Sequence, residues 1–105
     1  MCHIFAGQVP DTYECQTRSV RIGGHSTSIR LEAAFWGILE QVASSQGMSL
    51  GKFVTKLHDE VLELHGEVNN FASLLRCSCL IYLSETKAAQ NGTDRHALHY
   101  LEAAE

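Results

Sequence analysis

Apolar residues follow two different spacings along this chain, and the change of spacing separates an extended part from a helical part. In residues 17–31 they alternate with polar residues, at Val20, Ile22, Ile29 and Leu31. A period of two is typical of β-strands, in which successive side chains point to opposite faces. The Gly23-Gly24 step inside this stretch is compatible with either a hairpin turn or a bulge.

The second half of the stretch has two distinct faces. Ile29 and Leu31 share an apolar face, and the opposite face carries Ser26, Ser28 and Arg30. A short strand leaves its backbone hydrogen-bonding groups unpaired, and helices cannot offer it a strand edge. We therefore expect this strand to pair with the same strand of a second chain, as the antiparallel ribbon of a homodimer with helices behind it.

From residue 31 onward the apolar residues recur at intervals of three and four, which predicts helices. The first is expected over residues 32–46, before Gly47, and the second starts after the N-cap residue Ser49 and ends near Gly66. A third, over residues 71–83, is apolar on nearly all sides. Because a chain of 105 residues has little interior, we expect oligomerisation to bury this third helix.

The chain is expected to form one domain of a cytoplasmic protein. With 45% apolar residues it is too hydrophobic to be disordered, yet no apolar run reaches the roughly 18 residues of a membrane span. The first residues also lack the basic segment of a signal peptide. We divide the chain into an N-terminal arm, a core, an additional buried helix, and a polar tail or short helix, at residues 1–17, 18–66, 67–85 and 86–105.

Charge is unevenly distributed along the sequence. The formal net charge of −4 argues against a protein that coats nucleic acid without specificity. Residues 18–32 are nevertheless net positive, because Arg18, Arg21 and Arg30 outweigh Glu32. Positive charge therefore gathers at the predicted strand.

The order of strand, helix, glycine turn and serine-capped helix in STSIRLEAAFWGILEQVASSQGMSLGKFVTKLHDEVLEL resembles the ribbon-helix-helix DNA-binding family of the Arc, methionine and CopG repressors. This segment spans residues 26–64, and its most specific features are the I-R-L-E stretch, the aromatic pair Phe35-Trp36 and the G-x-S before the second helix. More narrowly, the chain resembles a bacterial subgroup with an added helix. The resemblance implies a mostly α fold whose dimeric β-ribbon enters the DNA major groove.

The resemblance also implies roles for individual residues. Ser26, Ser28 and Arg30 would contact base edges, and Arg30 is suited to guanine. Phosphates would be bound by two arginines and by the amides that start the second helix, at Arg18, Arg21, Met48, Ser49 and Leu50. Where the two arginines point depends on whether Gly23-Gly24 is a turn or a bulge. The dimer interface would comprise Ile29, Leu31, Phe35, Trp36, Phe53 and Leu57.

We therefore expect a transcriptional regulator that binds double-stranded DNA as a homodimer without a cofactor. The alternative is a dimeric module of the same fold that holds a protein partner, as an antitoxin holds its toxin. The acidic helical half and the apolar residues 71–83 favour this alternative.

No metal site is predicted. The cysteines lack C-x-x-C spacing, and Cys77 and Cys79 would point to opposite sides of a helix. His58 and His65 would lie about 10 Å apart along a helix axis, too far for joint ligation. The pair His96 and His99 has workable spacing but no third ligand nearby.

No enzyme is predicted either, because the sequence shows no arrangement for nucleophilic catalysis and no glycine-rich phosphate loop. The opening Met1-Cys2-His3-Ile4-Phe5 resembles amidotransferases with an N-terminal cysteine nucleophile. Those enzymes have glycine at the position of His3 and need a larger sheet domain than 105 residues can form. We expect this segment to be an apolar arm that packs on the dimer.

Overall fold

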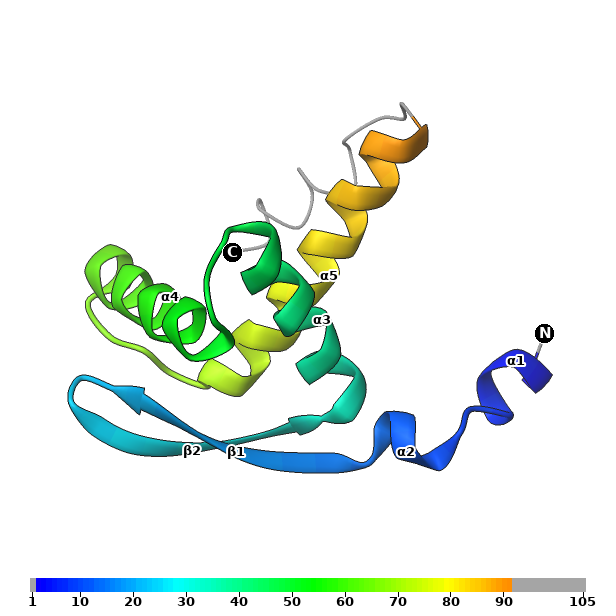
Figure 1. Cartoon of the computed structure of the whole chain (residues 1–105), viewed down its shortest axis with the longest axis horizontal. Helices are drawn as coiled ribbons and strands as arrows, with labels where there is room; N and C mark the ends of the chain where they lie inside the picture. The colour runs from blue at the N-terminus through cyan, green and yellow to red at the C-terminus, as the bar shows by residue number, and fades with distance from the viewer. Residues whose placement is uncertain (1, 92–105) are drawn as a thin grey trace.

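A β-hairpin with three helices packed against one of its faces forms the body of the molecule (Figure 1). The computed structural model describes residues 2–91. Its elements are α1 Cys2–Ala6, α2 Pro10–Tyr13, β1 Cys15–Ile22, β2 His25–Glu32, α3 Ala33–Ser45, α4 Leu50–His65 and α5 Phe71–Asn91. The predicted fold class, a mostly α ribbon-helix-helix arrangement, is confirmed.

Two glycines close the hairpin. Gly23 and Gly24 both have positive φ, at 59° and 82°. Positive φ at both central positions is what a two-residue type I′ turn needs, and the twist of this turn matches that of the flanking strands. The strands are antiparallel in a register that runs from Ile22 opposite His25 to Cys15 opposite Glu32. The Gly23-Gly24 step is therefore a hairpin turn and not a bulge.

The hairpin corrects the expectation that the strand pairs across a homodimer. The hydrogen-bonded partner of β2 is β1 of the same chain. The expectation treated the region as one strand with an unpaired ladder, whereas the glycine turn folds the preceding residues back against it. Along its other edge, β2 pairs with no strand among residues 2–91. Backbone pairing of this ribbon therefore does not require a second chain.

The face of the hairpin toward the helices forms the core together with all three of them. The buried residues are Val20, Ile29 and Leu31 from the hairpin, Trp36, Leu39, Val42 and Ala43 from α3, Phe53 and Val54 from α4, and Leu75 and Cys79 from α5. Four residues predicted for the dimer interface are in this core, and Phe35 and Leu57 pack partly buried against it. Leu31 and Trp36 keep no exposed surface. A single chain therefore buries these side chains without a partner.

The ends of α3 and α4 follow the predicted capping residues. After α3, Gly47 has a φ of 69° and the Met48 amide donates to the Ala43 carbonyl at 2.9 Å. Ser49 caps α4, because its Oγ accepts from the Lys52 amide at 3.2 Å. Gly66 ends α4 with a φ of 79°. These local signals set the ends of α3 and α4.

The last helix, α5, is longer and less buried than predicted. It continues to Asn91 instead of ending at residue 83, because residues 84–91 are mostly good helix formers although they lack apolar periodicity. Leu75 and Cys79 are buried, whereas Leu80 and Leu83 are 49% and 44% exposed. The remainder of the predicted tail lies outside the described residues. Neither α5 nor another helix within residues 2–91 is long and apolar enough to cross a membrane.

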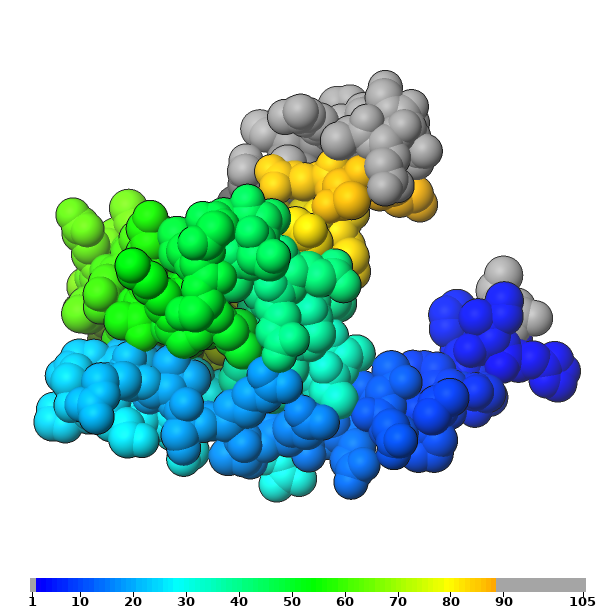
Figure 2. All heavy atoms as spheres, viewed as in Figure 1, coloured from blue at the N-terminus to red at the C-terminus, as the bar shows by residue number. Residues whose placement is uncertain are grey.

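The N-terminal arm leads away from the body of the molecule (Figure 2). Neither α1 nor α2 contains a buried residue. Four large apolar or aromatic side chains of this arm are exposed, at Ile4, Phe5, Val9 and Tyr13. The arm predicted over residues 1–17 is shorter in the structure, because β1 already begins at Cys15.

A substitution to aspartate should have different effects on the two faces of β2. Ile29 is 6% exposed in the core and its neighbour Ser28 is exposed. Ile29→Asp should lower the free energy of unfolding by more than about 3 kcal/mol, because it buries an unpaired charge. Ser28→Asp should leave a folded protein. Thermal unfolding followed by circular dichroism measures both, and a normally folded Ile29→Asp variant would contradict this core.

An ion pair joins the end of β2 to α5. Arg76 Nε donates to Glu32 Oε1 at 3.0 Å, and the Arg76 guanidinium lies 5.9 Å from the centre of the Phe35 ring. Hydrogen bonds to the Glu32 carboxylate, first from its own backbone amide and then from Arg76, lower the pKa of Glu32 below its usual value. The ionised carboxylate is therefore the form that stabilises the fold.

Because the pKa of Glu32 is lowered in the folded state, the stability that Glu32 contributes depends on pH. The contribution of Glu32 should be fully present above its unfolded pKa near 4.5 and lost as the pH falls through the folded pKa. Glu32→Gln should therefore unfold at a lower temperature than the wild type at pH 7, and the difference should shrink at about pH 3. Glu63→Gln, at an exposed position on α4, is the control. An equal difference at both pH values would exclude this role for Glu32.

Candidate nucleic-acid interface

The hairpin face that points away from the helices is polar and uncovered (Figure 1). Cross-strand partners in an antiparallel pair point to the same face, so the register defines this surface. Its rows are Thr17 opposite Arg30, Ser19 opposite Ser28, and Arg21 opposite Ser26. All six side chains are exposed. We call these six residues the outer face.

The outer face offers hydrogen-bonding groups without negative charge. Serine and threonine hydroxyls donate and accept, and an arginine guanidinium can donate two hydrogen bonds to one guanine. Glu32, which ends β2 on the same side by strand alternation, instead binds Arg76 of α5. A two-stranded ribbon also has a width that the roughly 12 Å major groove of B-DNA admits. The outer face therefore has the size and chemistry of a DNA-contacting surface.

The predicted base-contacting residues lie together on this surface. Ser26, Ser28 and Arg30 follow one another along β2, each exposed. Arg30 makes no ion pair within the described part of the chain. Arg21 reaches the same face from β1, where its Nη1 donates to the Gly24 carbonyl at 3.2 Å. One arginine therefore stands near each end of the outer face.

Arg18 lies on the other side of the hairpin. Its partner in the register is the buried Ile29, so it points toward the helices. Its guanidinium lies 5.0 Å from the centre of the Trp36 ring and donates to Glu40 Oε1 at 2.7 Å. The structure thus separates Arg18 from Arg21 and Arg30, and the phosphate contact expected for it does not fit this geometry.

The start of α4 meets the expectation of free backbone amides only in part. The Met48 amide already donates to the Ala43 carbonyl, and the Lys52 amide donates to Ser49 Oγ. The amides of Ser49 and Leu50 make no hydrogen bond within residues 2–91. Of the three predicted positions, two therefore keep a donor for a phosphate.

Sequence reasoning missed Thr17 and Ser19 as members of this surface. They belong to β1, which carries few apolar residues and does not stand out as a separate strand. The signal was the glycine pair: a two-residue turn at Gly23-Gly24 fixes the register and places Ser19 opposite Ser28.

Other candidate chemistry is weak in the described residues. No group of three His, Cys, Asp or Glu side chains there could hold a metal ion. Burial raises the pKa of the Cys79 thiol to about 11, so it is protonated and unreactive at neutral pH. The His58 ring packs edge-on against Phe71, with ring centres 5.1 Å apart. His96 and His99 lie outside the described residues.

Comparison with known proteins agrees with this architecture. Residues 15–83 match the profile of a family described as "Ribbon-helix-helix domain". The chain is also similar to the solved structure of an uncharacterized protein from Bordetella pertussis Tohama I, with a TM-score of 0.80, 39% identity, and coverage of 84% of this chain and 71% of that one. Among curated proteins there is no significant match. The matched segment extends from the first residue of β1 into α5.

The two faces predict different effects of removing an arginine. Arg18→Ala should lower the free energy of unfolding by about 1 kcal/mol, mainly because it removes the cation–π contact with Trp36, since the ion pair with Glu40 is exposed to water and contributes little. Arg30→Ala should change it by less than about 0.5 kcal/mol, because the side chain supports no packing. Urea unfolding of both variants measures the difference. Equal destabilisation would contradict the assignment of faces.

Proposed function

The chain belongs to the ribbon-helix-helix family, and from this membership and the outer face we propose that it is a sequence-specific DNA-binding regulator of transcription. Proteins of this family are typically DNA-binding regulators or antitoxins, and generally not enzymes. The observation that carries the proposal is the outer face: six exposed polar side chains, two of them arginines, on a ribbon of groove width.

In this proposal the hairpin lies in the major groove with its outer face against the base edges. Arg30 donates to a guanine, and the neighbouring hydroxyls of Ser26 and Ser28 contact adjacent bases. Arg21, Thr17 and Ser19 extend the contact along β1. Because hydroxyls accept from and donate to several bases, the arginines carry most of the discrimination.

The distribution of charge supports this orientation. The chain is acidic overall, but the hairpin is net positive, and the helices on its opposite side carry five acidic residues, at Glu40, Asp59, Glu60, Glu63 and Glu85. DNA approaching the outer face meets the basic side of the molecule first. With few cations available, we expect an affinity that is modest and falls with salt concentration.

We further propose that the protein acts as a homodimer, as ribbon-helix-helix proteins typically do. Four of the six residues first assigned to the interface are buried inside one chain, and Phe35 and Leu57 are partly buried, so we propose that the contact uses other surfaces. Leu80 and Leu83 on α5 are nearly half exposed and offer an apolar surface to a second copy. Each chain would then bring its own hairpin to the DNA.

A second candidate function is the binding of a protein partner, as in antitoxins. A groove of about 260 Å³ lies between α4 and α5, and Leu57, Val61, Leu64, Leu74 and Ile81 contribute to its lining. Leu62 and Leu64 on α4 are also exposed. An apolar groove between two helices is a surface that a partner helix can occupy.

Selection of bound duplexes from a random DNA pool tests the main proposal. The wild type should enrich a motif, and Arg30→Ala should relax the preference at one base position in each half-site, at a cost of about 1–3 kcal/mol in discrimination per position. Lys87→Ala, which removes an exposed cation on α5, should leave the motif unchanged.

Two outcomes oppose the proposal. If the folded wild type enriches no sequence, DNA recognition is wrong and the protein-partner function takes its place. If a motif is enriched but Arg30→Ala leaves it unchanged, the outer face does not contact bases through this residue.

A further inference from the structure

An acidic residue lies next to Arg30 on the same side of the hairpin. Strands β1 and β2 contain three arginines, and Glu32 is their one acidic residue. Alternation along β2 places Glu32 on the side that carries Ser26, Ser28 and Arg30. The Cα atoms of Arg30 and Glu32 are about 7 Å apart, two residues along a strand, and the two long side chains can bridge this span. Without another partner, the Glu32 carboxylate can therefore pair with the Arg30 guanidinium.

In the structure, Glu32 binds Arg76 of α5 instead. Arg76 Nε donates to Glu32 Oε1 at 3.0 Å. Because α5 lies on the helix side of the hairpin, this bond draws the carboxylate away from the outer face (Figure 1). Hydrogen bonds from the backbone and from Arg76 lower the pKa of Glu32, so its carboxylate is charged at neutral pH. Arg30 is left without an ion pair among residues 2–91.

The Arg76 guanidinium is also held by an aromatic ring. It lies 5.9 Å from the centre of the Phe35 ring, and Phe35 packs against the core. The neighbouring Leu75 is completely buried and anchors this turn of α5. The cation therefore has a defined position beside the end of β2, where it can hold the carboxylate.

Stability alone gives a weak reason for this ion pair. The side chains of Arg76 and Glu32 keep 35% and 31% of their surface exposed, and ion pairs at such exposure contribute little to folding. Leu75 and Cys79 are buried and already hold α5 against the core. The pair lies at the end of the strand that carries Arg30, so we look for its role at the outer face.

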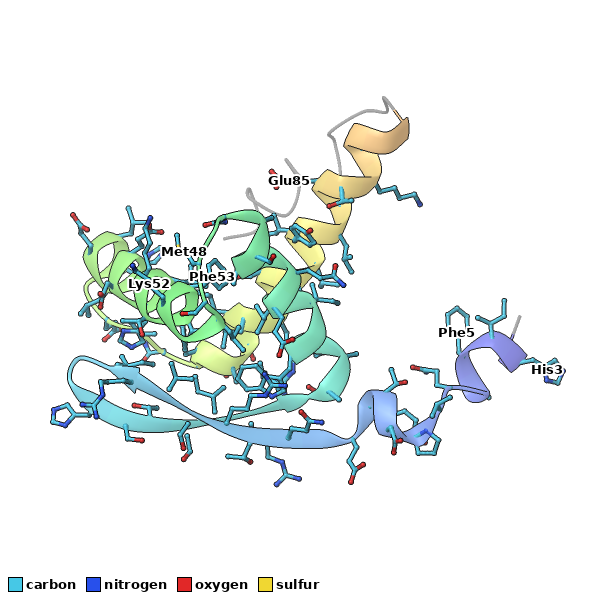
Figure 3. The ribbon with its side chains drawn as sticks, viewed as in Figure 1. His3, Phe5, Met48, Lys52, Phe53 and Glu85 are labelled. Atoms are coloured by element: carbon cyan, nitrogen blue, oxygen red, sulfur yellow. The ribbon has the colours of Figure 1, made fainter. Side chains whose placement is uncertain are left out.

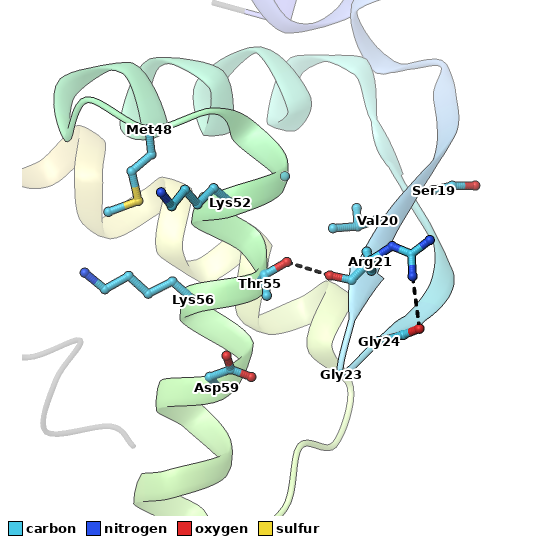
Figure 4. Close-up of a pocket in the computed structure, with 11 residues that line it drawn as sticks. Ser19, Val20, Arg21, Gly23, Gly24, Met48, Lys52, Thr55, Lys56 and Asp59 are labelled. Carbon is cyan, nitrogen blue, oxygen red and sulfur yellow. Dashed lines mark hydrogen bonds between the residues drawn. The ribbon is translucent and has the colours of Figure 1, made fainter.

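The other arginine of the outer face has a different setting. Arg21 Nη1 donates to the Gly24 carbonyl at 3.2 Å (Figure 4). Its partner in the register is Ser26, and Ser19 precedes it on the same face of β1. No acidic residue of the two strands lies beside Arg21. Of the two arginines, Arg30 is thus the one whose acidic neighbour must be held elsewhere.

We propose that Arg76 is a positioning residue for DNA binding, which holds the Glu32 carboxylate off the outer face and so leaves Arg30 free to contact a base. This inference rests on the proposed DNA-binding function. Arg76 acts through Glu32 and makes no contact with DNA itself. When Arg76 is removed, DNA binding suffers from the released carboxylate and not from the loss of a cation.

The test compares Arg76→Gln with Lys87→Gln, a charge-matched control on the same helix. Binding is measured on two duplexes, one with the selected motif and one in which the bases at the Arg30-dependent positions are replaced. Arg76→Gln should bind the motif duplex about two- to fivefold more weakly than Lys87→Gln does, because an exposed pair between Glu32 and Arg30 must first be broken. Its binding to the replaced duplex should fall less. Lys87→Gln should keep the discrimination of the wild type.

The double variant Arg76→Gln/Glu32→Gln separates this role from a structural one. It lacks the ion pair, so its melting temperature, followed by circular dichroism, should stay below that of the wild type, as for Arg76→Gln. It also lacks the carboxylate that could pair with Arg30, so its affinity and discrimination should return to wild-type values. A residue that only supports the fold would leave DNA binding impaired in the double variant as well.

The outcomes distinguish this inference from the function on which it rests. If the folded wild type enriches no motif, both are wrong. If a motif is enriched and Arg76→Gln discriminates between the duplexes as Lys87→Gln does, only the role of Arg76 is excluded. The role is also excluded if Arg76→Gln loses discrimination and the added Glu32→Gln substitution does not restore it.

Discussion

Trp36 joins the hairpin to the helices, and the rest of the structure depends on this contact. The indole is completely buried, and its Nε1 donates to the Gln16 carbonyl of β1 at 2.9 Å. Arg18 of the same strand covers the ring. Trp36 thus fills the centre of the core while its indole N–H keeps a hydrogen-bond acceptor. Figure 3 shows side chains in the space between the hairpin and the helices.

Burial of the hairpin face toward the helices determines which residues form the outer face, because successive side chains of a strand point to opposite sides. Once Val20, Ile29 and Leu31 are buried, the residues between them must point to solvent. Stability of the core and exposure of the polar surface are therefore one constraint. The same packing holds α4 beside β1, where Thr55 Oγ1 donates to the Arg21 carbonyl, so the start of α4 and the outer face keep a fixed relation.

The sequence predicted the features that depend on neighbouring residues, but not the features that depend on contacts between distant parts of the chain. The caps at Ser49 and Gly66 and the apolar face of β2 follow from near neighbours, and the structure has them. Apolar pattern alone shows that Trp36 is buried but not whether its own chain or a partner buries it. For the same reason, the sequence grouped Arg18 with the other arginines. Gln16 and Arg18 are polar residues at inward positions, so the alternation of apolar and polar residues is missing from this part of β1. The polar end of α5 shows that helix propensity can extend an element beyond its apolar pattern.

The glycine turn has a consequence for symmetry. A ribbon made from the same strand of two chains has a two-fold axis through its middle, so the groups on one half repeat on the other. The hairpin has no such axis, because Thr17, Ser19 and Arg21 face a different set, Arg30, Ser28 and Ser26. A duplex that matches this surface need not be an inverted repeat within the contacted base pairs. Each strand of the ribbon is then free to change independently, and one substitution alters one contact per chain.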